Sequence, residues 1–193
     1  SSPDLGELMS ISPKLSDLNW KRNQEFQNKN SYQKQAIYAF NGDVYDGIDI
    51  SSISTDKHEK IQESIRILSG LYGILKPFDI IKPYRLEMGT KLSVNGSKNL
   101  YDFWSKSVTN SITEEVSDNE LIINLASNEY FSVINSKLLS NKIISPQFKD
   151  FKNGKLKIIS FYAKIARGLM TRYLIEIKIK SENDILGFDY SGY

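Results

Sequence analysis

The chain has 193 residues, of which 40% are hydrophobic and 25% charged, and these values are ordinary for one globular domain. Its 25 Lys and Arg and 23 Asp and Glu leave a net charge of +2, so any surface that attracts a polyanion must come from local clustering. The lack of cysteine excludes disulfides, thiolate catalysis and thiolate metal sites, and no apolar run approaches the ~20 residues of a membrane helix. We therefore expect a single domain over residues 1–193 that is cytoplasmic, monomeric and without membrane contact.

The first quarter of the chain reads as helices separated by turns. Apolar residues recur at helical spacing over 3–26, and Ser12-Pro13 predicts a break followed by a new helix start. Residues 33–40 are predicted to form a short helix or strand that ends at the turn signal Asn41-Gly42. We expect residues 42–47 to form a glycine-bounded loop that carries two carboxylates.

The segment 65–92 is the most informative part of the sequence. Residues 56–68 are predicted to be helical, because their apolar side chains share one face, and Gly70 and Gly73 then bound a hairpin. Two short helices joined by such a hairpin leave the first N–H groups of the second helix free, and such groups attract phosphate. This pattern favours nucleic acid as the partner.

The second half mixes helices and strands without regular alternation, which indicates an α+β fold. A helix is predicted over 99–114, and another from about 162 to 178. Three apolar segments are strand candidates: 120–126, 143–148 and 156–161. Asn153-Gly154 is a hairpin signal.

The C-terminal helix has an apolar face and a basic face at ~100° per residue. The apolar arc contains Ile165, Leu169, Met170, Tyr173 and Ile177; the basic arc contains Lys164, Arg167, Thr171 and Lys178, with Arg172 on a flank. Just upstream, Lys152, Lys155 and Lys157 lie near Phe161 and Tyr162. Basic residues among aromatics suit phosphate contacts and base stacking. On these residues alone, a solvated helix face and ordinary core aromatics are the favoured interpretation.

Polar groups elsewhere leave an enzymatic alternative open. It is a pocket for a phosphate-bearing or small acidic substrate, built from Asp43, Tyr45, Arg85, Glu87, Ser127 and Glu129. Arg85 and Glu87 can equally pair with each other, and Ser127 is more typical of a helix cap. Direct iron binding by Asp43, Asp46, Glu87 and Glu129 is a weaker idea, since His58 is the only histidine. No nucleotide or cofactor motif is present, so we assign no metal and no cofactor.

Long strings of the sequence resemble the YaaA peroxide-stress family of bacterial proteins. They are KQAIYAFNGDVYDGID at 34–49, RILSGLYGILKPFDIIKPYRLEMGTKL at 66–92, NLYDFW at 99–104, INLASNEYF at 123–131 and KNGKLKIISFYAKIARGLMTRY at 152–173. Compared with the family, the chain lacks an N-terminal strand and a C-terminal tail, so we expect an incomplete copy. Ser64 stands where the family often has His, and Ile165 where it commonly has a second Lys.

The resemblance implies an α+β fold described as cantaloupe-like, with a helix-hairpin-helix element at Leu68–Gly73 and a positively charged cleft. It also implies resistance to hydrogen peroxide, limitation of free iron, protection of DNA, and binding of duplex and branched DNA. We expect this binding to be largely independent of base sequence. No enzymatic activity is implied. The expected DNA-binding residues are Arg66, Gly70, Tyr72, Gly73, Lys76, Arg85, Lys91, Lys157, Lys164, Arg167 and Arg172.

Overall fold

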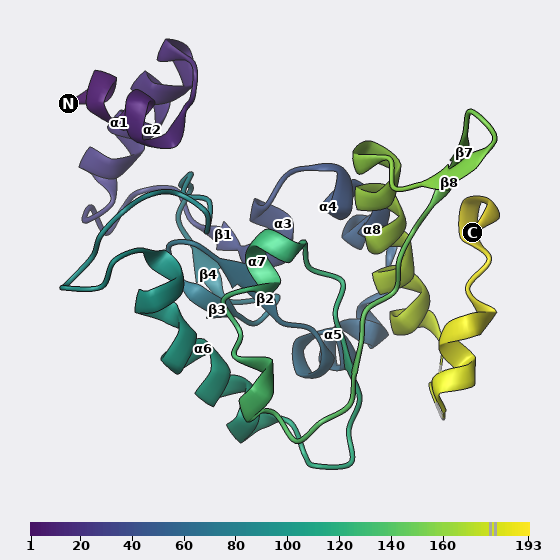
Figure 1. Ribbon diagram of the computed structural model, residues 1–193. Helices are drawn as coiled ribbons and strands as arrows, with labels where there is room; N and C mark the ends of the chain where they lie inside the picture. The colour runs from purple at the N-terminus through teal and green to yellow at the C-terminus, as the bar shows by residue number, and fades with distance from the viewer. Residues whose placement is uncertain (178, 180) are drawn as a thin grey trace. The chain divides into compact units, whose positions relative to one another are not determined.

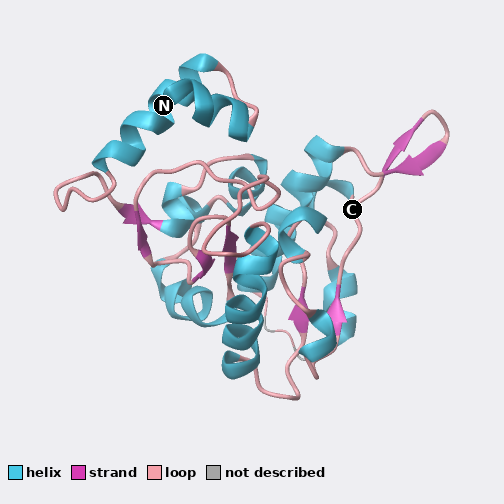
Figure 2. Cartoon of the chain, turned by 60° about the vertical axis from the view of Figure 1, so that its left-hand side comes forward, coloured by secondary structure: helices cyan, strands magenta, loops and turns pink. Residues whose placement is uncertain are grey.

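The computed structural model describes residues 1–177, 179 and 181–193. Short strands that pair two by two alternate irregularly with helices, and this arrangement confirms the α+β class (Figure 1, Figure 2). The chain divides into two compact units. The first comprises Ser1–Ala36, Arg66–Ile122 and Ala126–Lys142, and the second comprises Ile37–Ile65, Ile123–Leu125 and Ile143–Tyr193. Among the described residues, no helix has both the length and the apolar character needed to cross a membrane.

The first unit begins with two helices that confirm the predicted break. Its elements are α1 (Ser2–Met9), α2 (Pro13–Glu25), β1 (Lys34–Gln35), β2 (Ile67–Ser69), β3 (Gly73–Leu75), β4 (Ile80–Ile81), α6 (Leu100–Glu115) and α7 (Asn128–Phe131). Ser12 accepts a hydrogen bond from Leu15 N, and Pro13 opens α2. At the other end of α2, Lys82 Nζ donates to the carbonyl oxygens of Phe26 (2.5 Å) and Asn28 (2.8 Å).

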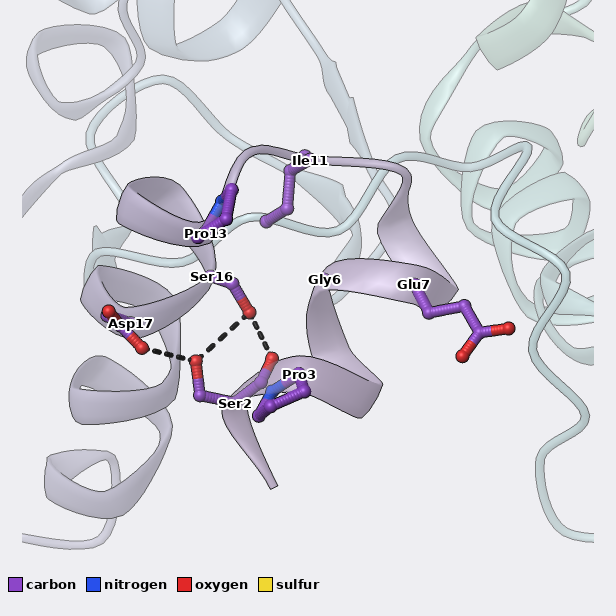
Figure 3. A pocket seen from close by; sticks show the side chains of 8 residues that line it. All are labelled: Ser2, Pro3, Gly6, Glu7, Ile11, Pro13, Ser16 and Asp17. Atoms are coloured by element: carbon purple, nitrogen blue, oxygen red, sulfur yellow. Dashed lines mark hydrogen bonds between the residues drawn. The ribbon is translucent and has the colours of Figure 1, made fainter.

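A cavity of about 430 Å³ lies between α1 and α2 (Figure 3). It is lined by Ser2, Pro3, Gly6, Glu7, Ile11, Pro13, Ser16 and Asp17. Ser2 Oγ donates to Asp17 Oδ1 at 2.6 Å, and Ser16 Oγ donates to the Ser2 carbonyl oxygen. These bonds join the two helices, and none of the residues predicted to bind DNA or substrate lines the cavity.

The helix-hairpin-helix prediction at Leu68–Gly73 is wrong, because this segment is a β-hairpin. β2 pairs antiparallel with β3, with Ser69 opposite Gly73. Ser69 Oγ accepts hydrogen bonds from Leu71 N (3.2 Å) and Tyr72 N (2.9 Å), which closes the turn. Gly73 has a φ of 75°, a left-handed value that favours glycine. The helix predicted over 56–68 ends earlier, at Ser64.

The core of the first unit forms where α6 packs beside this hairpin. Its buried members are Met88, Leu100, Val108, Ile112 and Val133. Trp104 Nε1 donates to the Gly70 carbonyl oxygen at 2.9 Å. A Cβ on Gly73 would lie 2.6 Å from the same indole ring. The two glycines therefore allow close packing of the hairpin, which explains them without any ligand.

The second unit contains the remaining elements. They are α3 (Ala36–Ala39), which leads into it, α4 (Asp43–Ile48), α5 (His58–Ser64), β6 (Ile143–Ile144), β7 (Asp150–Lys152), β8 (Lys155–Lys157) and α8 (Ser160–Glu176). β5 (Ile122–Ile123) pairs with β6. The loop predicted over 42–47 is instead α4. Gly42 O accepts from the backbone of Tyr45 (2.8 Å) and Asp46 (3.1 Å), and the acidic first turn suits the helix dipole.

Helix α8 packs on both sides within the second unit. Ala163, Ala166 and Met170 face a cluster with Phe148 and Phe188, while Gly168 faces α4. The strand predicted over 156–161 ends at Lys157 because α8 already begins at Ser160, and the strands predicted over 120–126 and 143–148 shrink to β5 and β6. Lys178, placed on the basic arc, lies outside the described residues.

Candidate nucleic-acid interface

Positive charge is concentrated in residues 149–172 of the second unit. This stretch has seven Lys or Arg and one Asp, a net charge of +6, whereas the whole chain carries +2. The remaining residues therefore carry a net −4. Local clustering of this kind is the condition that a nearly neutral chain must meet to attract a polyanion.

Strands β7 and β8 form a hairpin that extends away from the N-terminal end of α8 (Figure 1, Figure 2). The register pairs Asp150 with Lys157, Phe151 with Leu156 and Lys152 with Lys155. Asn153 and Gly154 have φ values of 54° and 73°, as the inverted two-residue hairpin turn requires, so the predicted hairpin signal is confirmed. Except for Asp150, every residue of the two strands is exposed.

Two cations of α8 lie on the helix face between its packed sides. The Lys164 side chain is 51% exposed, and its Nζ lies 3.6 Å from Asp43 Oδ2. An ion pair at this distance and exposure contributes little to stability, so Lys164 can exchange Asp43 for a phosphate. The Arg167 guanidinium makes no ion pair or side-chain hydrogen bond with any residue that the structure describes. The exposed Lys164 is therefore available to an external anion, and the half-buried Arg167 has no partner among the described residues that would compete with one.

Arg172 is engaged within the second unit. Its Nε lies 2.8 Å from Glu176 Oε1, and its Nη1 donates to Ser52 Oγ at 2.6 Å and to the Ile48 carbonyl oxygen at 3.2 Å. Its side chain is only 22% exposed. These bonds hold the end of α4 against α8, so Arg172 acts as a structural residue of this unit.

The other predicted DNA-binding residues belong to the first unit, and most have partners there. The Arg66 guanidinium pairs with Glu115, and Lys76 Nζ lies 4.0 Å from the same carboxylate. Arg85 Nη2 donates to Glu87 Oε1 at 2.9 Å. Tyr72 accepts a hydrogen bond from Lys82 N at 3.1 Å. Lys91 is exposed. Joint action of these residues with the cations of the second unit stays a prediction.

The residues of the alternative enzyme pocket are divided between the units. Asp43 and Tyr45 belong to the second unit, and the other four to the first. Ser127 caps α7 by accepting from Tyr130 N, as predicted, and Glu129 Oε1 accepts from Gly89 N at 2.9 Å. Arg85 and Glu87 pair with each other. The four first-unit side chains thus satisfy structural bonds, and a shared catalytic pocket stays an untested prediction.

Tyrosines near these carboxylates are strongly perturbed by burial. Burial raises the pKa of Tyr84 to about 12, although a 2.6 Å hydrogen bond with Ser69 Oγ acts the other way. Burial also raises the pKa of Tyr130, and nearby Tyr84, Glu129 and Glu87 add to this shift. Both phenols therefore stay protonated at neutral pH. Among the described residues, no three His, Asp or Glu side chains gather to hold a metal ion.

Sequence reasoning missed the exposed apolar residues of the β7–β8 hairpin. The strand prediction over 156–161 includes Leu156, and none of the predicted sites or elements includes Phe151. The Phe151 side chain is 76% exposed, and Leu156 opposite it is 57% exposed. A signal was present in the sequence after Asn153-Gly154, where Lys155 and Lys157 alternate with the single apolar residues Leu156 and Ile158.

Comparison with known proteins identifies the family. The peroxide stress protein YaaA family matches residues 1–193, the whole of this chain. The chain belongs to the YaaA family. It is similar to UPF0246 proteins of Flavobacterium psychrophilum (55% identity) and Flavobacterium johnsoniae (53% identity), in each case over 98% of this chain and 76% of the relative. A UPF0246 protein of Marinomonas is 49% identical over all of this chain and 75% of its own length. The resemblance inferred from the sequence strings is thereby confirmed.

Proposed function

We propose that this YaaA-family protein acts in peroxide stress by binding DNA, largely without sequence preference, and so limits iron-dependent oxidative damage to it. The proposed contact is the basic surface of the second unit, which consists of Lys152, Lys155, Lys157, Lys164 and Arg167. The observation that carries the proposal is the net charge of +6 within residues 149–172 of a chain whose total is +2.

The chemistry of the basic surface suits the phosphate backbone. Lysine is a compact point charge on a flexible stem, and flexible lysines follow a polyphosphate without demanding one base sequence. The three hairpin lysines are exposed. A short connection joins β8 to α8, and Lys164 and Arg167 lie in the first two turns of that helix. Binding through such residues releases counterions, so it must weaken steeply as salt rises.

Arg172 is left out of the proposed surface because its bonds to α4 occupy it. Lys91 and Arg85 of the first unit are exposed and stay candidates for further phosphate contacts, although Arg85 would have to leave Glu87. We also propose that any effect on iron is indirect. A protein that coats DNA removes the target from iron-generated oxidants without ligating the metal, and no metal-holding group lies among the described residues.

Charge reversal on α8 tests this proposal. Lys164→Glu with Arg167→Glu should weaken binding to every duplex tested and make the log–log salt slope less steep by about 1.8, from about 0.9 per phosphate contact. Because Glu at position 164 would face Asp43, the neutral pair Lys164→Gln with Arg167→Gln should be measured beside it. Lys14→Glu with Lys21→Glu, two exposed lysines of α2, is the matched control. Unchanged binding by both α8 variants at low salt would contradict the proposal.

A further inference from the structure

We propose that the β7–β8 hairpin is a DNA-binding arm that lies in the major groove, with Phe151 and Leu156 against base edges and lysines on the phosphates of both strands. This inference rests on the proposed function and adds a contact to the bases that the basic surface alone does not provide.

One face of the hairpin is apolar and faces solvent. Because Phe151 and Leu156 are cross-strand partners, they lie on the same face, and Ile158 comes directly after β8. The three side chains are 76%, 57% and 57% exposed. Phe161 and Tyr162, at the start of α8, are also about half exposed. Five large apolar side chains exposed within twelve residues are typical of a binding surface.

The other face carries lysines that repel each other. Lys152 and Lys155 are directly opposite, and like charges at such positions destabilise a strand pair. Lys157 is opposite Asp150, whose carboxylate accepts hydrogen bonds from the Tyr193 hydroxyl at 2.9 and 3.1 Å. The tip of the hairpin therefore holds uncompensated positive charge. An anionic ligand near the tip would relieve this repulsion, which argues for a polyanion as the occupant.

The dimensions of the hairpin fit a DNA groove. Two paired strands lie about 4.8 Å apart, and the major groove, about 12 Å wide, admits a two-stranded ribbon. β7 contributes Lys152 to one edge of the ribbon, and β8 contributes Lys155 and Lys157 to the other. With the apolar face on the groove floor, the long lysine stems can reach a phosphate backbone on each side.

A flat anionic membrane fits the same residues less well. If the apolar face entered a bilayer, the lysines of the opposite face would point away from the lipid headgroups. The walls of a groove rise on both sides of the ribbon, so the same lysines meet phosphate there. Thymine carries a methyl group into the major groove, and apolar side chains contact it favourably.

The test compares arm variants on duplexes that contain thymine or deoxyuridine in its place, titrated with salt. Phe151→Ala with Leu156→Ala should weaken binding to the thymine duplex about tenfold. The two side chains are expected to be only partly buried against the bases, and together they would contribute about as much binding free energy as one fully buried aliphatic side chain. Its salt slope should stay that of the parent chain, because no cation is removed. Replacing thymine by deoxyuridine should weaken the parent but leave this variant unaffected. Lys152→Gln with Lys155→Gln should instead make the slope less steep by about 1.8.

Matched controls separate this inference from the proposed function. Leu138→Ala with Leu186→Ala removes two exposed leucines outside the arm and should change neither affinity nor slope. The arm residues lie outside the core, so every variant should keep the parent's circular dichroism spectrum, and none should melt at a lower temperature than the parent. If Phe151→Ala with Leu156→Ala binds the thymine duplex as tightly as the parent chain, while Lys152→Gln with Lys155→Gln still makes the salt slope less steep, the apolar contact of the arm is overturned and the basic surface stands. A parent chain that does not bind DNA would overturn both proposals.

A membrane readout completes the test. If Phe151→Ala with Leu156→Ala abolishes sedimentation with phosphatidylserine vesicles while duplex binding is unchanged, the arm is a membrane contact and the inference is wrong. Equal vesicle binding by parent and variant, together with the tenfold loss on DNA, supports it.

Discussion

Substituting Gly168 by alanine should destabilise the contact between α4 and α8, the helix that carries part of the basic surface. A Cβ on Gly168 would overlap the Val44 carbonyl oxygen and lie 2.8 Å from Gly47 Cα. Both neighbours are backbone atoms of α4, so no side chain can rotate away to make room. Gly47 is the reciprocal case, since its Cβ would overlap the Ile165 carbonyl oxygen.

The size of the effect follows from two opposing contributions. Alanine is favoured over glycine in a helix interior by about 1 kcal/mol, which alone would stabilise α8. Overpacking typically costs about 1–3 kcal/mol and more where backbone must move. Because two helix backbones must separate here, the clash should outweigh the propensity. We expect a net loss near 2 kcal/mol and a melting temperature lower by roughly 4–8 °C.

Thermal and urea unfolding monitored by circular dichroism measure this change. Gly6→Ala is the matched control, because it adds the same methyl group to α1, where the nearest atom is the Ser16 hydroxyl oxygen at 3.1 Å rather than backbone. We expect it to be neutral or slightly stabilising. If Gly168→Ala is as stable as the parent, the close backbone approach of α4 and α8 is not present and the reasoning is refuted.

Three further changes probe other parts of the account. Lys60→Met removes an ammonium that donates to the carbonyl oxygens of Leu174 (2.9 Å), Ile175 (2.8 Å) and Ile177 (2.5 Å) at the end of α8. The free energy of unfolding, measured in urea, should therefore fall by about 1–3 kcal/mol. Arg172→Gln should also lower the free energy of unfolding by about 1–3 kcal/mol, yet leave the salt slope of DNA binding unchanged. A slope less steep by about 0.9 would show that Arg172 contacts a phosphate. The free energy of unfolding should fall as pH rises from 10 toward 12, because Tyr84 keeps its proton in the folded state while the unfolded chain loses it. Tyr84→Phe should flatten this decline when unfolding is measured at alkaline pH. An unchanged decline would contradict the burial of this phenol.

Local signals in the sequence predicted the elements whose causes are local. Ser12-Pro13 marked the start of α2, and Asn153-Gly154 marked the β7–β8 turn, because capping and turn geometry depend on adjacent residues. Gly70 and Gly73 misled the prediction. Glycine is required at these two positions because Leu86 and Trp104 pack against them from other parts of the fold. The sequence alone does not show these contacts, so it suggested a hairpin between helices.

The candidate site was predictable to a similar extent. Helical periodicity placed Lys164 and Arg167 on a solvent face, and the structure shows Lys164 exposed and Arg167 half-buried. The bonds of Arg172 could not be predicted, because its partners Ile48 and Ser52 are more than a hundred residues away in sequence, and its DNA contact stays a prediction. Lysines that alternate with Leu156 and Ile158 were a signal for an exposed strand, whereas the 76% exposure of Phe151 is seen only in the structure, since an apolar residue in a strand is usually buried.

The slope of binding affinity against salt concentration, measured for the parent chain on duplex DNA, tests the central claim most directly. Five cations on the basic surface, each neutralising one phosphate, predict a log–log slope of about −4.5 at neutral pH. A slope near zero, or no binding at low salt, would contradict the account, because a contact made through phosphates must release counterions.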